Sequence, residues 1–403
     1  MTTTTVTLPP DRERQIVWVL AGIQFMHILD FVLMMPLGPQ LMRLFTLTPR
    51  DFGLLVSVYM FAAAVSGVAA SAYADRFDRR TLMLWLAVGF VVALGATAAA
   101  PSFSALLVAH AGAGAFGGVL GMQVHAYLGD TVPDARRGKA TGIIMSSFAV
   151  ASVVGVPIGL LLADAASWRA PFAALALAAL VLFVIAARVL PPIRAHLEAG
   201  RAERVLVTYG RVLREPNHRR AFLLIAFITF AGFSIIPYIA PYMVKNVKIA
   251  EAHIPLMYFV GGVTTFFTTR WIGRQVDLRG KLRVFRWVAF ASLAPIIAMT
   301  HLPPVPLWTA VLVGALFMSL VSGRFVPAMA MMNAAAAPGL RGSFLSLSGA
   351  VQQTAAGCAS LAAGLTIGHG TAGELTNYGW IGISGVLFTL AAIAWAARVR
   401  ALS

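Results

Sequence analysis

The chain has few charged residues and almost no cysteine. Asp, Glu, Lys and Arg account for 11% of its 403 residues, and Cys358 is the single cysteine. Soluble domains carry about 25% charged residues, so this composition excludes a soluble enzyme. One cysteine excludes a disulfide framework, and no Cys/His group has the spacing of a structural zinc site. Because a phosphate-binding G-x-x-x-x-G-K-[ST] loop is also missing, we expect no metal, no cofactor and no ATP-driven chemistry.

Apolar residues take the place of these charges. They make up 59% of the sequence, and a helix that spans a membrane needs about 20 of them in a row. The sequence therefore predicts an all-α membrane protein with twelve transmembrane helices. The expected spans are residues 16–37, 51–73, 81–100, 102–128, 139–163, 170–190, 221–243, 253–272, 282–301, 307–333, 343–367 and 379–397.

The basic residues follow the loops between these spans. The net charge is +16, and most of the 31 Lys and Arg fall in the loops on the side that also holds both termini. Because basic loops stay in the cytoplasm, the pattern predicts cytoplasmic termini and a multi-pass protein of the bacterial cytoplasmic membrane. Basic loops there contact lipid headgroups, so we expect membrane lipids and no nucleic acid as partners. Residues 1–15 are polar, so no cleavable signal peptide is expected.

The chain divides into two similar parts. A polar stretch at 191–220 predicts a cytoplasmic linker between a six-helix half at 1–190 and a second at 221–403. The loop after span 2, SAYADRFDRR from Ser71, resembles GRQVDLRGK from Gly273 after span 8. Shorter similarities precede spans 5 and 11 and lie within spans 1 and 7. Duplicated halves with a substrate site between them are a transporter architecture.

These loops resemble the G-x-x-x-D-R-x-G-R-R signature of the major facilitator superfamily. The first copy keeps the acid and the basic residues but has Ser71 and Asp78 in place of both glycines, and the second has Leu278 in place of the arginine. The resemblance implies a conformational latch, because a carboxylate at a helix N-terminus is favourable and can separate when the halves rock. The alternative is an ordinary basic loop. The latch residues would be Asp75, Arg76, Arg79, Arg80, Asp277, Gly280 and Lys281.

Span 5 contains a second motif, Gly155-Val-Pro157-Ile-Gly159. It resembles the proline–glycine motif of the twelve-span drug:proton antiporter branch. Small residues permit close helix packing and proline a kink, so the motif is expected to pack helices. That branch usually has an arginine in span 4, where this sequence has His110. A histidine can carry protons but is not a permanent cation.

Asp30 is the one acidic residue deep inside an apolar span. Gln24, His27 and Asp30 follow at steps of three and form one polar stripe on a helix. An intramembrane acid is a functional candidate, and burial favours its protonated form. Asp30, His27 and His110 are therefore the expected proton-coupling residues. A structural hydrogen-bonding cluster is the alternative.

Arg324 in span 10 is the one intramembrane arginine, and it needs an anion, water or carbonyl groups as partners. At 1.5 Å per residue, Asp30 and Arg324 lie about 21 and 14 Å above the cytoplasmic face, so one arginine side chain could join them. A snorkelling or helix-locking arginine is the alternative.

Aromatic residues in span 7 indicate a cavity for a ring-containing cargo, although they could equally face lipid. In the resembled family, spans 1, 4, 7 and 10 line the central cavity. The expected substrate-cavity residues are Gln24, Asp30, Phe230, Phe233, Tyr238, Arg324, Asn333 and Gln352.

The sequence thus predicts a monomeric secondary active transporter of a small organic molecule, and no enzyme. Alternating access with efflux against proton entry is favoured. The alternative is proton-coupled uptake of a nutrient or acidic metabolite. A copper importer is less favoured, because it rests on one His253-x-x-x-Met257 pair, and Met is also ordinary packing material.

Overall fold

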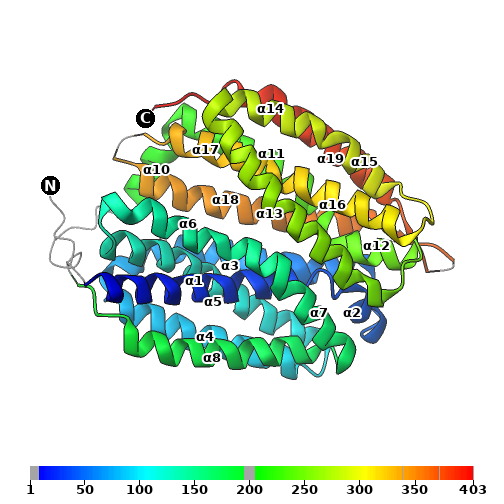
Figure 1. Cartoon of the computed structure of the whole chain (residues 1–403), viewed down its shortest axis with the longest axis horizontal. Coiled ribbons are helices and arrows are strands. Elements are labelled where there is room, and N and C mark those ends of the chain that lie inside the picture. The colour runs from blue at the N-terminus through cyan, green and yellow to red at the C-terminus, as the bar shows by residue number, and fades with distance from the viewer. Residues whose placement is uncertain (1–8, 195–204, 338, 372, 403) are drawn as a thin grey trace.

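The protein consists almost entirely of long helices (Figure 1). The computed structural model describes residues 9–194, 205–337, 339–371 and 373–402. The first group, called the N-terminal bundle, contains α1 (Pro10–Leu33), α2 (Gly38–Leu44), α3 (Pro49–Tyr73), η1 (Ala74–Arg76), α4 (Arg79–Ala99), α5 (Phe103–Thr131), α6 (Asp134–Val150), η2 (Ala151–Gly155), α7 (Val156–Ala165) and α8 (Arg169–Val189).

The second group, called the C-terminal bundle, contains α11 (Pro216–Phe233), η3 (Ile236–Tyr238), α12 (Ile239–Lys245), η4 (Glu251–His253), α13 (Ile254–Arg279), α14 (Lys281–Ala291), α15 (Leu293–Thr300), α16 (Leu307–Gly323), α17 (Phe325–Ala335), α18 (Arg341–Thr366), α19 (Tyr378–Ala396) and a hairpin of β1 (Gly368–His369) and β2 (Leu375–Thr376). Helix α10 (Val205–Arg214) precedes it and packs on α3 and α18. Four of the ten charged residues of the predicted linker fall in residues 195–204, outside the described part.

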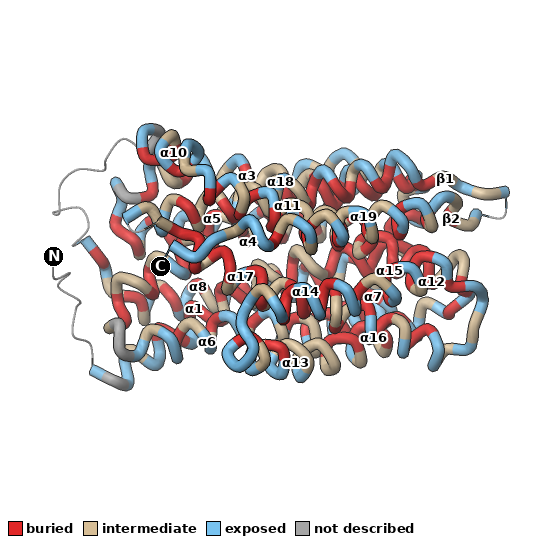
Figure 2. Tube along the Cα trace, turned by 90° about the horizontal axis from the view of Figure 1, so that it is seen from above, coloured by how far each residue is buried: buried red, intermediate tan, exposed pale blue. Residues whose placement is uncertain are grey.

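The two bundles lie side by side as two layers of near-parallel helices (Figure 1). The layers meet where α3 packs on α18 and where α13 packs on η2 and α7. Residues 9 and 402 lie at one end of the molecule, called here the terminal end. Helices α2 and α12 and the β-hairpin lie at the opposite, far end (Figures 1 and 2).

Ten stretches are long and apolar enough to cross a membrane. They match ten of the twelve predicted spans. The other two correspond to α13 and α18, which have 26 residues each but a more polar composition. Large apolar side chains such as Trp85 and Leu177 are exposed on the outer surface, 72% and 64% respectively. Apolar side chains exposed in this way along apolar helices fit contact with lipid.

Local signals in the sequence set where helices begin and break. Thr48 and Asp51 form a capping box at the start of α3, and Asp78 accepts a hydrogen bond from the Thr81 backbone at the start of α4. The helix of span 5 widens into a π-helical turn at Ala151–Gly155, just before Pro157. Span 10 is interrupted at Arg324, where α16 ends and α17 begins, close to Gly323 and Pro327, two residue types that loosen or kink helices.

Candidate functional site: a buried polar cluster beside an apolar cavity

A polar cluster lies inside the N-terminal bundle, where α1, α3 and α5 meet. The Nδ1 atom of His27 is 3.2 Å from the Tyr59 hydroxyl, and the Tyr59 ring lies 4.9 Å from that of His110. Asp30, one turn along α1 from His27, interacts electrostatically with Tyr59. The structure therefore brings the three predicted proton-coupling residues around one tyrosine.

The Asp30 carboxyl is fully buried, with 0% of the residue exposed. Neither of its oxygens has a hydrogen-bond partner among the described residues, and the same is true of the side-chain oxygen of Gln24. An ionised carboxylate without a donor is very costly in such a place, whereas a protonated carboxyl is much less so. The site is therefore suited to holding and releasing a proton.

Glycines of α5 make room for this cluster. A Cβ at Gly117 would lie 2.9 Å from the Tyr59 hydroxyl, and one at Gly121 would lie 3.0 Å from Nε2 of His27. At Gly114 a Cβ would meet the Tyr59 backbone, with its Cα at 2.8 Å. The glycine-rich segment of span 4 thus lets α5 approach α1 and α3 closely. Sequence analysis did not identify Tyr59 as part of this cluster. The row of glycines in span 4 that faces it was the available signal, because it indicates a close approach of helices.

An apolar cavity of about 110 Å³ lies between the two bundles. Its walls come from α1, α6, η2 and α7 on one side and from α11, η3, α12, α13, α15 and α16 on the other. The lining residues are Phe31, Val32, Met35, Phe148, Ser152, Val156, Phe233, Ile236, Ile239, Met257, Tyr258, Gly262, Thr265, Met299, Gly314, Phe317, Met318, Val321 and Ser322. None of these residues is charged, which suits a neutral, ring-containing molecule.

Phe31 connects the polar cluster to the cavity. It follows Asp30 in α1 and lines the cavity, and its ring lies 5.2 Å from the Tyr59 ring and 6.0 Å from the Phe233 ring. Rings at these separations are in contact. One side chain therefore touches both the proposed proton site and the opposite bundle.

Arg324 is fully buried but does not pair with Asp30. Its guanidinium donates to the Thr389 hydroxyl at 2.8 Å and to the Ile228 carbonyl oxygen at 3.1 Å, both within the C-terminal bundle. It also stands at the junction between the C-terminal end of α16 and the N-terminal end of α17, so the two helix dipoles act on its charge in opposite directions. The depth estimate from the sequence was compatible with a pair, but depth does not fix the direction in which a side chain points.

The other expected cavity residues lie in several different places. Of the eight, Phe233 alone lines the cavity described above. Phe230 packs instead on Phe388, with ring centroids 4.3 Å apart. Tyr238 is buried near the far end, while Asn333 and Gln352 are half-buried on α17 and α18. Sequence analysis did not single out Tyr258 or Thr265, because single hydroxyls in an apolar span give little signal.

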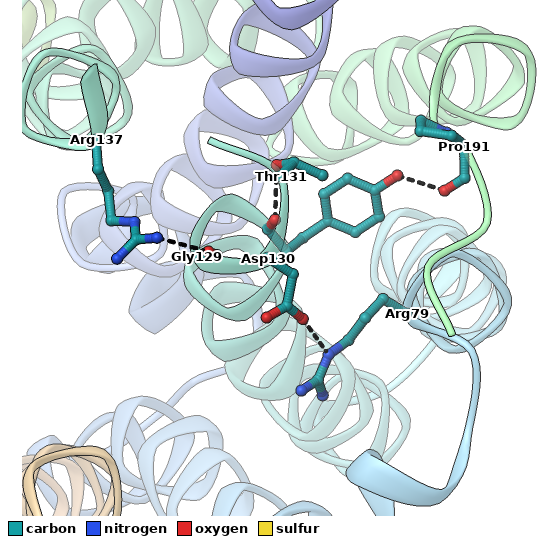
Figure 3. Close-up of polar contacts among 7 residues, drawn as sticks. Arg79, Gly129, Asp130, Thr131, Arg137 and Pro191 are labelled. Atoms are coloured by element: carbon teal, nitrogen blue, oxygen red, sulfur yellow. Dashed lines mark hydrogen bonds and ion pairs between the residues drawn. The ribbon is translucent and has the colours of Figure 1, made fainter. Parts of the chain in front are cut away.

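The first loop motif forms a network within the N-terminal bundle (Figure 3). Arg79 donates to the Asp130 carboxylate at 3.0 Å, and Arg80 donates to the Ala187 carbonyl oxygen. Nearby, Arg137 donates to the Gly129 carbonyl oxygen at 2.9 Å (Figure 3). These bonds join the terminal ends of α4, α5, α6 and α8. Of the other residues, Arg76 is exposed and the Asp75 side chain lies outside the described part.

The second loop motif is more exposed. Asp277 and Lys281 are both exposed. Gly280 has a φ of +86° and joins α13 to α14, a conformation that favours glycine. The motif therefore provides a turn between two helices.

Side-chain bonds join the two bundles at the far end. The Arg43 guanidinium of α2 pairs with both Glu251 carboxylate oxygens of η4, and one of these contacts measures 3.1 Å. This pairing raises the pKa of Arg43 above its ordinary value. The Tyr238 hydroxyl lies 3.1 Å from the carbonyl oxygens of both Pro49 and Ser360.

The span 5 motif packs against α1. A Cβ at Gly155 would lie 2.8 Å from a Leu29 methyl, and one at Gly159 would lie 2.6 Å from a Leu33 methyl. Pro157, between them, is buried at the start of α7. The described residues contain no group of three or more His, Cys, Asp or Glu side chains that could hold a metal.

These features define a multi-pass membrane transporter. The family model of the Major Facilitator Superfamily matches residues 20–236, more than half of the chain, and the chain belongs to this family. The predicted family resemblance, the membrane location and the expectation of a transporter instead of an enzyme are thereby confirmed.

Two relatives and one solved structure match most of the chain. The chain is 27% identical over 381 residues to an uncharacterized MFS-type transporter, YceJ, of Bacillus subtilis, covering 93% of this chain and 94% of the relative. It is 29% identical over 349 residues to a chloramphenicol resistance protein of Streptomyces lividans, covering 84% of each. The structure of a D-xylose-proton symporter superposes with a TM-score of 0.73 at 18% identity, covering 94% and 96% of the two chains.

Proposed function

We propose that the protein exports a small organic molecule in exchange for protons, by alternating access. The main support for this proposal is the Asp30 carboxyl. It is fully buried, has no hydrogen-bond partner among the described residues and stands next to a cavity wall. Relatives described as a chloramphenicol resistance protein and as probable sugar efflux transporters support the outward direction.

The proposal includes the membrane topology. Twelve spans, including α13 and α18, form two halves at residues 1–190 and 221–403, joined by a linker at 191–220. The terminal end faces the cytoplasm, and the far end faces outward. In this arrangement the contacts of Arg43 with Glu251 close the outer side of the cavity.

Proton and cargo use different sites. The proton binds Asp30, with His27 and Tyr59 beside it, and the cargo occupies the cavity between the bundles. Phe31 belongs to both sites, so a change of protonation at Asp30 alters the wall that the cargo contacts. A ligand shifts a conformational equilibrium only through such differential contacts.

The loop residues act in the cycle without touching cargo. Arg79, Arg80 and Asp130 hold the terminal ends of α4, α5 and α8 together, and Arg137 adds α6, so this end of the N-terminal bundle moves as one unit. Asp75 and Asp277 are proposed as latch residues that stabilise one conformation.

Proteoliposomes with an internal pH-sensitive dye test the exchange. With chloramphenicol as the first cargo, an inward cargo gradient should make the interior more alkaline, because each entering molecule drives protons out. Acidification would instead establish uptake with protons. No pH change while labelled cargo enters would show an uncoupled carrier and contradict the proposal.

A further inference from the structure

Two hydroxyl groups of α13 face the apolar cavity. Tyr258 and Thr265 are seven residues apart, which places them on the same face of the helix two turns from each other. Both line the cavity. The cavity wall on the C-terminal side therefore carries these two hydroxyls, together with that of Ser322 on α16, on an otherwise apolar surface.

Neither hydroxyl is satisfied within the described part of the protein. Tyr258 is buried, with 8% of the residue exposed, and neither its hydroxyl nor that of Thr265 has a hydrogen-bond partner there. Leaving a buried hydroxyl without a partner is unfavourable. A bound molecule with a polar group would remove that cost.

Two neighbouring hydroxyls bond to backbone carbonyl oxygens of their own helix. Thr264, next to Thr265, is bonded to the carbonyl oxygens of Val260 and Gly261 at 2.9 and 3.0 Å. Ser152, across the cavity, is bonded to the Phe148 carbonyl oxygen at 2.9 Å. These two hydroxyls bond to their own backbone, whereas those of Tyr258 and Thr265 do not. Thr229 and Ser319 also have buried hydroxyls without partners among the described residues, but they do not line the cavity, as Tyr258 and Thr265 do.

The other cavity walls indicate the size, charge and aromatic character of the ligand. Phe31, Phe233 and Phe317 supply aromatic surface, and no charged side chain lines the cavity. An engineered cavity of about 150 Å³ holds benzene, so with about 110 Å³ this cavity encloses at most about one ring of the cargo. An ion would have no counter-charge there, and its desolvation would oppose binding.

We propose that Tyr258 and Thr265 determine cargo specificity, and that the cargo is an uncharged aromatic molecule with a polar group that hydrogen-bonds to one or the other of these hydroxyls. The inference deepens the proposed function and assigns the substrate class of its cavity. It also separates the roles of the bundles, with the proton site on the N-terminal side and cargo recognition on α13.

Equilibrium dialysis with matched probes tests this assignment. The protein in nanodiscs is dialysed against 4-methylphenol and against 1,4-dimethylbenzene, which has a methyl group in place of the hydroxyl, and protein-free nanodiscs provide the background. The measured quantity is the ratio of the two affinities. In the double variant Tyr258→Phe with Thr265→Val this ratio should fall by about five-fold or more, the effect of losing a hydrogen bond.

Thr264→Val is the matched control, because it removes a hydroxyl that bonds to its own helix. It should leave the ratio unchanged, and thermal unfolding of each variant verifies that it folds. The charged probes 4-methylbenzoate and benzyltrimethylammonium should show no saturable binding. An unchanged ratio in the double variant, an equal fall in Thr264→Val, tighter binding of a charged probe, or no saturable binding of 4-methylphenol would each overturn the assignment.

The experiment is independent of proton coupling. Dialysis involves no gradient, so an uncoupled carrier would still show the hydroxyl-dependent ratio, and only the proteoliposome experiment would fail. Conversely, a failed dialysis result with intact proton exchange would remove the substrate class and keep the transport mechanism.

Discussion

Two buried charged residues differ in how the protein satisfies them. Asp30 in the N-terminal bundle and Arg324 in the C-terminal bundle are both 0% exposed. Arg324 donates two hydrogen bonds from its terminal nitrogens, although its Nε has no partner among the described residues, whereas neither Asp30 oxygen has any partner there. A buried charge that is held by hydrogen bonds stabilises one arrangement, while a buried carboxyl without any is sensitive to protonation. The comparison therefore supports the proposal that Arg324 is structural and that Asp30 exchanges protons.

The largest expected effect comes from Asp30→Asn. Asparagine has nearly the same size but cannot exchange a proton, so proton-driven accumulation of cargo should be lost. Exchange of labelled for unlabelled cargo across the proteoliposome membrane should continue, because the cavity is unchanged. Asp164→Asn, an exposed position on α7, is the control. Normal pH-dependent accumulation in Asp30→Asn would remove Asp30 from the mechanism.

Arg324→Lys should lower the stability of the protein and leave proton coupling intact, the opposite of what is expected for Asp30→Asn. Lysine keeps the charge but lacks the fork that reaches both Thr389 and Ile228, so the free energy of unfolding should fall by about 1.5–3 kcal/mol. Thermal unfolding of the purified protein measures this change. The number of protons moved per cargo molecule should stay the same. A changed proton stoichiometry with unaltered stability would reverse the assignment of the two residues.

A moderate effect is expected where the proton and cargo sites meet. Phe31→Leu keeps an apolar side chain but removes ring contacts with Tyr59 and Phe233. Cargo should still bind, while fewer protons should move per cargo molecule. Phe227→Leu is the control, because Phe227 contacts Phe388 and Trp395 within the C-terminal bundle. Equal coupling in the Phe31 and Phe227 variants would argue against Phe31 as the connection.

The smallest effect concerns His369 in the β-hairpin, outside the membrane spans. Burial, together with the charge of Lys245, lowers the pKa of His369 from its ordinary value of 6.5. A histidine with a lowered pKa in the folded state favours folding while it is neutral, so stability should decrease as the pH falls through 6.5. His369→Gln should flatten this part of a stability–pH curve and leave proton coupling intact. An unchanged curve would contradict the expectation.

Much of the fold was predictable because apolar length is a strong signal. Ten predicted spans match, and the break at Arg324 follows from Gly323 and Pro327 nearby. The count of twelve rests on α13 and α18, whose composition is more polar. Asp30 was identifiable as a candidate because an acid in an apolar span is rare and costly.

The partners of these residues were less predictable. Residue spacing gives depth along a helix but not the rotation of that helix, so Arg324 was expected to face Asp30 and instead bonds to Thr389 and Ile228. Tyr59 lies in an apolar run like any packing residue, and its role became visible only when α1, α3 and α5 were placed together.

The sharing of Phe31 between two otherwise separate sites bears on how such proteins diversify. Substitutions in the cavity walls formed by α13 and α16 can change the substrate specificity without altering the residues around Asp30. Related proteins can thus keep the proposed proton coupling while the set of compounds that they transport changes. Selection should act most strongly against substitutions of Phe31, because they would alter proton coupling and substrate binding together.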